Sequence, residues 1–210
     1  MKFNKIYYCF FLAVAFIVFQ STQGFAQRHT WFGAATYQMS FPLGDTKNFT
    51  DETSFRGIGL DFRYTIQKST TVGLTFSWNV FHQRTSETAE LGTKNPGAVT
   101  GTQDRYINAF PIMANIHYYF GERGRIRPYV GLNAGGYFML QRFAIGIVTL
   151  DNDRWEWGVA PEVGLIIPVE RDFAIMVNGK YNYAFTGESV LGNDINHSYV
   201  GLNIGFVWQQ

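Results

Sequence analysis

The chain has 210 residues, of which 18% are aromatic and 16% charged, and it contains 22 glycines and 20 phenylalanines. This composition favours strands over helices. The 17 Lys and Arg residues nearly balance the 16 Asp and Glu residues. A formal net charge of +1 excludes the strongly basic character that nucleic-acid binding requires, so we expect no nucleic-acid partner.

The first 26 residues have the pattern of a cleavable signal peptide. Lys2 and Lys5 form a short basic head, an apolar run from 6 to 19 follows, and small residues end the segment at Ala26. The apolar run of about 14 residues is shorter than the roughly 20 that cross a bilayer as a helix. We therefore predict a signal peptide at 1–26 and a mature domain at 27–210.

Downstream, apolar and polar residues alternate with period two in segments rich in Gly, Val, Ile and aromatic residues, which predicts strands. Each segment reaches the roughly 9–11 residues of a tilted membrane strand, whereas soluble strands usually have about 5–6. Short turns alternate with the long loops 42–55, 82–104, 141–153 and 186–196, as in a barrel inserted from one side of a membrane. The predicted strands are 30–41, 56–66, 71–81, 105–120, 126–140, 154–167, 172–185 and 197–208.

The second predicted strand separates an apolar face with Ile58 and Leu60 from a face with Asp61 and Arg63. A membrane barrel turns the apolar face outward, because Arg or Lys at the bilayer midplane costs about 2–4 kcal/mol. A soluble barrel turns it inward, and alternation alone fits both. Aromatic residues at both ends of the apolar face favour the membrane, since lipid interfaces select such rings. The predicted girdles are Trp31, Tyr64, Tyr118, Phe173 and Trp208 at the short-turn end, and Trp78, Tyr106, Phe138, Trp155 and Tyr183 at the long-loop end.

Polar residues of the opposite parity predict a lumen filled by interlocking side chains, since eight strands enclose space only for side chains. A turn centred near Glu170 places Glu162 opposite Asn178, with Lys180 as a diagonal neighbour. The predicted lumen network is Asp61, Arg63, Asn115, His117, Glu162, Asn178 and Lys180. Prolines within predicted strands remove ladder donors and predict bulges or register changes at Pro111, Pro128 and Pro161.

Several segments resemble the small bacterial outer-membrane β-barrel family often described as porin-like, with OmpA- and OmpX-type architecture. They are Phe-Pro-Ile-Met at 110–113, His-Tyr-Tyr-Phe at 117–120, the glycine-rich stretch 127–136 and 157–164. The last strand, 199–208, is similar to the aromatic-ended signal read by the outer-membrane assembly machinery, although two glutamines follow Trp208. The resemblance implies an all-β, eight-stranded, antiparallel up-and-down transmembrane barrel in the outer membrane, with lipid and the assembly machinery as partners.

Catalytic and metal-binding chemistry has little support in the sequence. The four histidines show no metal-ligand spacing, so we expect no metal and no cofactor. A lipid-modifying hydrolase remains an alternative, in which His82, Ser86 and Glu87 form a catalytic set near the outer rim. No motif frames these residues, and residues of these types are ordinary in loops. We therefore predict a protein that is not an enzyme.

Three functions remain compatible with the residues. The first is a non-enzymatic barrel that anchors external loops in a structural or adhesive role, with 82–104 as the contact surface for an envelope or extracellular protein. The second is a narrow porin-like passage for small solutes. The third is a secreted, lipocalin-like soluble carrier with a ligand in its core.

Overall fold

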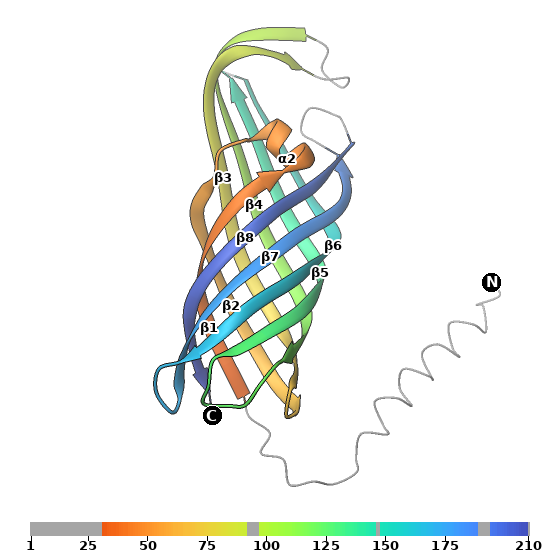
Figure 1. The fold of residues 1–210 in the computed structure, drawn as a ribbon. Coiled ribbons are helices and arrows are strands. Elements are labelled where there is room, and N and C mark those ends of the chain that lie inside the picture. The colour runs from red at the N-terminus through yellow and green to blue at the C-terminus, as the bar shows by residue number, and fades with distance from the viewer. Residues whose placement is uncertain (1–30, 92–96, 146–147, 189–193, 210) are drawn as a thin grey trace, which may run out of the picture.

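The computed structural model describes residues 31–91, 97–145, 148–188 and 194–209, so the predicted signal peptide lies outside the described part. Eight antiparallel strands close into a barrel, in which each strand pairs with its sequence neighbours and the last pairs with the first (Figure 1). The predicted fold class is therefore confirmed. The elements are β1 (Trp31–Leu43), α2 (Gly44–Phe49), β2 (Ser54–Gln67), β3 (Thr70–Leu91), β4 (Gly97–Tyr119), β5 (Arg127–Ile145), β6 (Val148–Pro168), β7 (Phe173–Glu188) and β8 (Asp194–Gln209).

Among the residues described, no helix has the length and apolar character needed to cross a membrane.

The strands follow the period-two pattern of the sequence. Along β2, Gly57, Gly59, Asp61, Arg63 and Thr65 are buried, and the residues between them are partly or fully exposed. Successive side chains of a strand point to opposite faces. The apolar side chains of β2 therefore form the outer wall, and the charged pair faces the lumen.

The register fixes the tilt of the barrel. Following paired residues once around the barrel from Gly33 leads to Leu43, a stagger of ten residues along β1. With about 3.3 Å per residue and strands about 4.8 Å apart, this stagger gives a tilt of about 40° and a radius of about 8 Å. The path is Gly33, Phe62, Leu74, Ala114, Ala134, Val159, Tyr183, Ser198 and Leu43.

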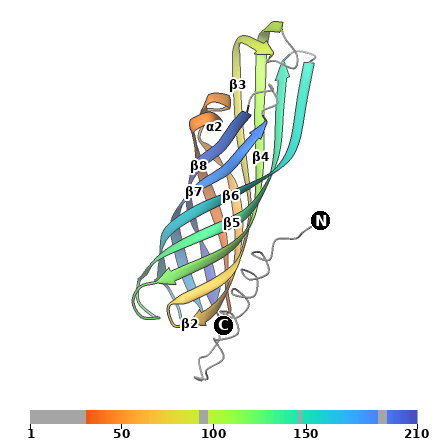
Figure 2. The same ribbon diagram turned by 90° about the vertical axis from the view of Figure 1, so that its right-hand side faces the viewer.

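The long loops predicted at 82–104 and 141–153 are wrong for most of their length, because both segments continue as hairpins. Thr85 pairs with Gln103, and pairing extends to Leu91 opposite Gly97. Likewise Phe143 pairs with Leu150 across β5 and β6. Figures 1 and 2 show the yellow-green β3–β4 hairpin, with β5 and β6 beside it, extending beyond the remaining strands. Outside a bilayer a strand needs no apolar face, so the alternation that marks membrane strands ends before the ladder does.

The predicted register changes at Pro111, Pro128 and Pro161 are also wrong. Pairing lapses beside Pro111 between β3 and β4, and beside Pro161 between β6 and β7, but the register on either side is unchanged. Pro128 lies in a continuous ladder opposite Leu165. The shifts that do occur lie on β1, β2 and β7, away from all three prolines. Losing a single ladder donor therefore leaves the alignment of these long strands intact.

Candidate functional site

A buried network of charged side chains lies inside the barrel around Arg63. The Arg63 side chain is fully buried and donates through Nη1 to the Tyr119 hydroxyl (2.8 Å). Its Nη2 donates to Asp61 Oδ1 and to Glu162 Oε1, both at 3.2 Å. The ring of Tyr129 lies against the guanidinium, with its centroid 5.3 Å from Cζ. β2 thus supplies one cation and one anion to the network, and β6 supplies the second anion.

Glu162 is the centre of this network. Its Oε1 accepts the Tyr129 hydroxyl (2.6 Å), and its Oε2 accepts the Asn133 amide (3.1 Å). The same Oε2 lies 3.2 Å from His117 Nε2 and 3.3 Å from Lys180 Nζ. An ionised carboxylate inside a barrel needs such donors, because burying an unpaired charge is costly.

The predicted pairing of Glu162 with Asn178 is wrong, because Glu162 lies directly opposite Lys180, and Asn178 pairs with Gly164. Val169 N and Glu170 N both donate to the carbonyl of Phe173. The turn is therefore centred one residue later than predicted. The two strands of a hairpin run in opposite directions, so moving the centre of the turn by one residue changes the partner of each strand residue by two positions. The ion pair is consequently direct.

The remaining predicted lumen residues attach to this centre in different ways. Asp61 accepts the Thr75 hydroxyl (2.6 Å), and Asn115 donates to that hydroxyl (2.8 Å). Asn178 instead accepts from Asn203 at 2.6 Å, beside the charged group. Besides His117, the network contains two carboxylates, Asp61 and Glu162, and two cations, Arg63 and Lys180.

Apolar layers above and below the charged network were missed by the sequence analysis. The layer toward the short turns contains Phe32, Tyr119, Tyr129 and Met176. The layer toward the long hairpins contains Phe81, Tyr137, Met139, Phe143 and Tyr199. Their inward parity, shared with Arg63 and His117, was a usable signal. It was overlooked because aromatic residues were considered only as candidates for the lipid face.

The helix α2 lies at the long-hairpin end of the barrel, as Figure 1 shows. Phe49 is only 5% exposed and belongs to the apolar layer toward the long hairpins. Arg105 Nη1 donates to the Phe49 carbonyl (3.0 Å). On the other side, Thr46 Oγ1 accepts Ser198 N (2.9 Å), and Asp45 accepts Asn196 N (3.2 Å). The β1–β2 connection is therefore fastened to β4 and β8 as a cap.

A second buried polar group, also missed, lies beneath this cap. Glu156 is paired with Arg154, and Arg154 Nη2 lies 2.7 Å from His197 Nε2. Gln141 Nε2 is 3.1 Å from the same nitrogen, and Thr46 Oγ1 is 3.3 Å from Nδ1. The four strand residues of this group, Gln141, Arg154, Glu156 and His197, have inward parity, but all except Glu156 fall in segments that the sequence analysis assigned to loops or strand ends.

The pocket described in the polar part of the lumen is very small. It is lined by Gln38, Asn79, Lys180 and Asn203, among others, and has a volume of about 10 Å³. One water molecule needs about 10–15 Å³. Close fitting extends to the backbone, since a Cβ at Gly131 would lie 2.1 Å from the His117 ring.

The outer wall is apolar, with aromatic residues toward both ends. Of the predicted girdle residues, Trp31, Trp78, Tyr118, Phe138, Trp155, Phe173 and Trp208 are exposed, and Tyr64, Tyr106 and Tyr183 are half-buried. Neighbouring rings contact one another, as in Trp31 with Tyr64 (centroids 4.9 Å apart) and the stack of Trp78 on Phe110 (5.9 Å). Between the two ends lie exposed aliphatic residues, including Ile58, Leu60, Leu74, Leu132 and Leu202.

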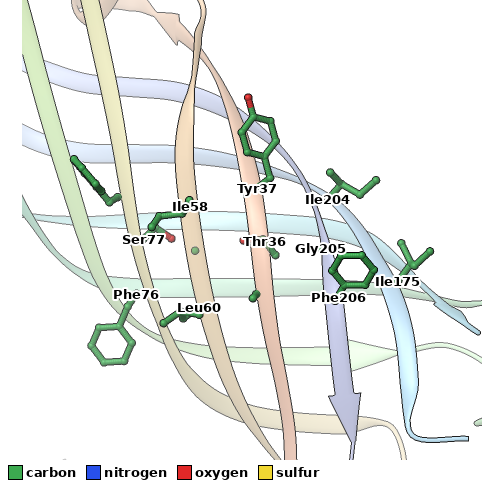
Figure 3. Close-up of a pocket in the computed structure, with 13 residues that line it drawn as sticks. Thr36, Tyr37, Ile58, Leu60, Phe76, Ser77, Ile175, Ile204, Gly205 and Phe206 are labelled. Carbon is green, nitrogen blue, oxygen red and sulfur yellow. The ribbon is translucent and has the colours of Figure 1, made fainter. Parts of the chain in front are cut away.

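A groove of about 750 Å³ lies on the outer surface of this wall and is centred on β1 (Figure 3). Ala35 lines the groove with a small side chain. The side chains of Leu60, Phe76, Ile204 and Phe206 also line it. Apolar side chains form nearly all of its edge, so the groove suits hydrocarbon and offers no set of polar groups for catalysis.

Of the alternative catalytic set, only the side chain of His82 lies in the described part. His82 Nε2 lies 3.6 Å from Asp104 Oδ1, and its ring stacks on Tyr106 with centroids 4.2 Å apart. The side chains of Ser86 and Glu87 lie outside the described part. Among the described residues, no group of three or more His, Cys, Asp or Glu residues is placed to hold a metal ion.

An apolar outer wall around a charged interior defines the architecture of a transmembrane β-barrel, the inverse of a soluble one. Solved structures of small outer-membrane barrels have the same fold. Ail, the attachment invasion locus protein of Yersinia pestis, solved in complex with the heparin analogue sucrose octasulfate, matches with a TM-score of 0.51 and 16% identity over 88% of this chain and all of its own. Neisserial surface protein A matches at 0.51 and 14%, over 88% and 99% of the two chains.

Outer membrane protein W of Escherichia coli gives a similar result, with a TM-score of 0.51 and 17% identity over 89% of this chain and all of its own. No family model matches this chain, and no curated protein matches it. At these identities the likeness establishes the fold. The chain has the fold of the small bacterial outer-membrane β-barrels.

Proposed function

We propose that this protein is a non-enzymatic barrel of the bacterial outer membrane that holds a protruding sheet outside the cell for contact with another protein. The observation that carries this proposal is the inverted distribution of side chains. Leu60 is 46% exposed on the outer wall, whereas neighbouring Asp61 and Arg63 are buried inside. Water would favour the opposite arrangement, and lipid favours this one.

The protruding sheet supports the contact role. The β2–β3 ladder begins at Gly57 opposite Asn79, and the β6–β7 ladder begins at Gly158 opposite Ala184. Beyond those pairs, within the described ladders, β3 pairs only with β4 and β6 only with β5. Apart from the Val80 carbonyl, which accepts the Ser54 hydroxyl, both outer strands therefore present backbone donors and acceptors along one side within these ladders. Free strand edges accept an extended segment of a partner by adding it to the sheet.

A sealed lumen is the second part of the proposal. The charged network, the two apolar layers and the cap with Phe49 follow one another along the barrel axis and leave little space in the polar part. Balanced charges interlocked by hydrogen bonds would hold this filling in place. A narrow passage for solutes would require these side chains to separate.

Three measurements test whether the chain inserts into the outer membrane and whether its lumen is closed to ions. After refolding into vesicles, the chain should migrate faster on a gel when unheated than when boiled, and native envelope fractionation should place it in the outer membrane. A chain that stays soluble without detergent would overturn the membrane seat and favour the soluble carrier. In planar bilayers we expect no steady current, and a sustained large conductance from the intact protein would refute the seal.

Photo-cross-linking tests the contact role. A photoreactive residue at Thr85, on the free edge of β3, should give a defined higher-mass adduct in intact envelopes. The same residue at Leu132, in the middle of the outer wall, is the control and should give none. Adducts absent from every position of the β3 and β6 edges would contradict the proposal.

Biogenesis through the outer-membrane assembly machinery is also part of the proposal. β8 ends with outward Phe206 and Trp208 before the two terminal glutamines. Replacing both rings with alanine should slow insertion by the purified machinery more than spontaneous folding into detergent. Equal slowing in both would exclude recognition of these rings.

A further inference from the structure

A polar pocket lies on the outer wall immediately beyond one aromatic girdle. Phe138 pairs with Trp155, and the next outward pairs along β5 and β6 are Leu140 with Asp153 and Arg142 with Asp151. At about 3.3 Å per residue and a tilt of about 40°, these pairs lie about 5 and 10 Å beyond the girdle along the barrel axis. The headgroup layer of a bilayer is about 5–7 Å thick on each side. The pocket therefore starts at the depth of lipid headgroups.

The pocket has a volume of about 620 Å³ and lies over β4, β5 and β6. Its walls are held by contacts with β3. Trp78 Nε1 donates to Asn108 Oδ1 (3.2 Å), a bond that does not use the two amide N–H donors of Asn108, which lines the pocket. The ring of Tyr106 is stacked on His82 at an interplanar angle of 18°. The lining is Tyr106, Asn108, Leu140, Gln141, Arg142, Asp151 and Asp153.

The charges of the pocket have both signs. Arg142 Nε donates to Asp151 Oδ1 (2.7 Å), and its Nη2 donates to Oδ2 (3.2 Å). This pair leaves three of the five guanidinium N–H groups for another acceptor. Both side chains are at least half exposed, at 61% and 50%, so solvent screens the pair and its net stabilisation is small. Asp153 adds a second carboxylate, which gives the pocket one cation and two anions.

We propose that this pocket binds the headgroup of a membrane phospholipid that joins a primary ammonium to a phosphate, as phosphatidylethanolamine does. Asp153 and Asp151 accept from the ammonium, while Arg142 and the Asn108 amide donate to the phosphate. Leu140, Phe138 and Trp155 lie below and receive the start of the acyl chains. The inference rests on the proposed seat in the membrane, since only there does a lipid meet this wall.

The headgroup chemistry is selective. A primary ammonium has three N–H donors and can serve both carboxylates, whereas the quaternary ammonium of phosphatidylcholine has none. Phosphatidylglycerol has the phosphate but no cation, so its headgroup has no positive charge to pair with the Asp153 carboxylate. The excess of one carboxylate over the cations therefore favours the ammonium lipid over both.

The test uses the full chain refolded into vesicles of equal parts phosphatidylethanolamine, phosphatidylcholine and phosphatidylglycerol, with the retained lipids counted by native mass spectrometry. We expect phosphatidylethanolamine to be enriched about fivefold over the other two, as an exposed charged contact of this kind allows. Asp153→Asn should lower that enrichment to about one. Arg142→Gln should reduce retention of all three lipids, because each carries the phosphate to which Arg142 donates. Arg84→Gln, on the same outer face but outside the pocket, is the matched control and should keep the enrichment.

Equal retention of the three lipids by the wild-type chain would overturn the inference, as would equal loss in Arg84→Gln and Asp153→Asn. A preference for phosphatidylglycerol would also overturn it, because Arg142 alone would then govern binding. These failures are distinct from failure of the proposed function. A chain that never inserts lacks the heat-dependent gel shift, whereas an inserted chain without lipid preference contradicts the pocket alone.

Discussion

Replacing Arg63 with methionine should show how much the charged network contributes to the free energy of unfolding. Methionine keeps much of the length and apolar volume but removes the cation that bonds Asp61, Glu162 and the Tyr119 hydroxyl. Glu162 retains Lys180, so the lumen is left with one uncompensated negative charge. Removing one partner of a buried ion pair typically costs about 3–5 kcal/mol.

The decisive comparison is a double variant. Asp61→Asn keeps an oxygen that can accept the Thr75 hydroxyl, and combined with Arg63→Met it restores charge balance in the lumen. We expect the double variant to be about 1–2 kcal/mol more stable than Arg63→Met alone, although Asp61→Asn by itself should destabilise.

Urea titration in detergent micelles, followed by tryptophan fluorescence, measures these differences. A loss of about 4 kcal/mol should lower the midpoint by about 2 M urea, given slopes of about 1–3 kcal/mol per molar. A loss below about 1 kcal/mol for Arg63→Met would mean that water already solvates the network. Strict additivity of the two substitutions would show that charge balance is not what stabilises it. Either result would refute this reasoning.

Two further predictions concern the outer wall and the cap. Leu60→Arg should cost about 2–4 kcal/mol in vesicles, whereas Ile66→Arg, near the short-turn rim, should cost about 0–1 kcal/mol, because the penalty depends on depth; equal urea midpoints for the two variants would contradict the placement of the bilayer. Phe49→Ala should cost about 3 kcal/mol and raise hydrogen exchange in 44–50, whereas Phe55→Ala, with a 60% exposed ring, should do neither; matching exchange in both variants would show that Phe49 does not hold the cap.

Alternation along the strands was sufficient to predict the barrel and the direction of most side chains. Side chains that face lipid are apolar and those that face the lumen are polar, so the two kinds alternate along a strand. In β2 this alternation shows which side chains face lipid and which face the lumen. The register was not predictable to the same precision. The partner of Glu162 depends on which residue centres the β6–β7 turn, and an error of one residue changed a direct ion pair into a diagonal one.

The parts that were missed lie where lipid no longer constrains the sequence. Above the aromatic girdle both faces of the β3–β4 hairpin are free to be polar, so Thr85 to Leu91 have the composition of a loop although they form a ladder. Inside the barrel, Tyr129 and Tyr137 take positions that also suit asparagine or glutamate, because a tyrosine can fill apolar space and still donate through its hydroxyl. Composition alone does not distinguish these uses.

The pairing of β1 with β8 has a consequence for how the molecule is made. Phe32 lies beside Gln209, so the pairing that closes the barrel joins the first and the last of the described strands. Contacts between such distant positions carry a large entropic penalty and form late. Until β8 is available, β1 keeps one unpaired edge, and such an edge is exposed to aggregation.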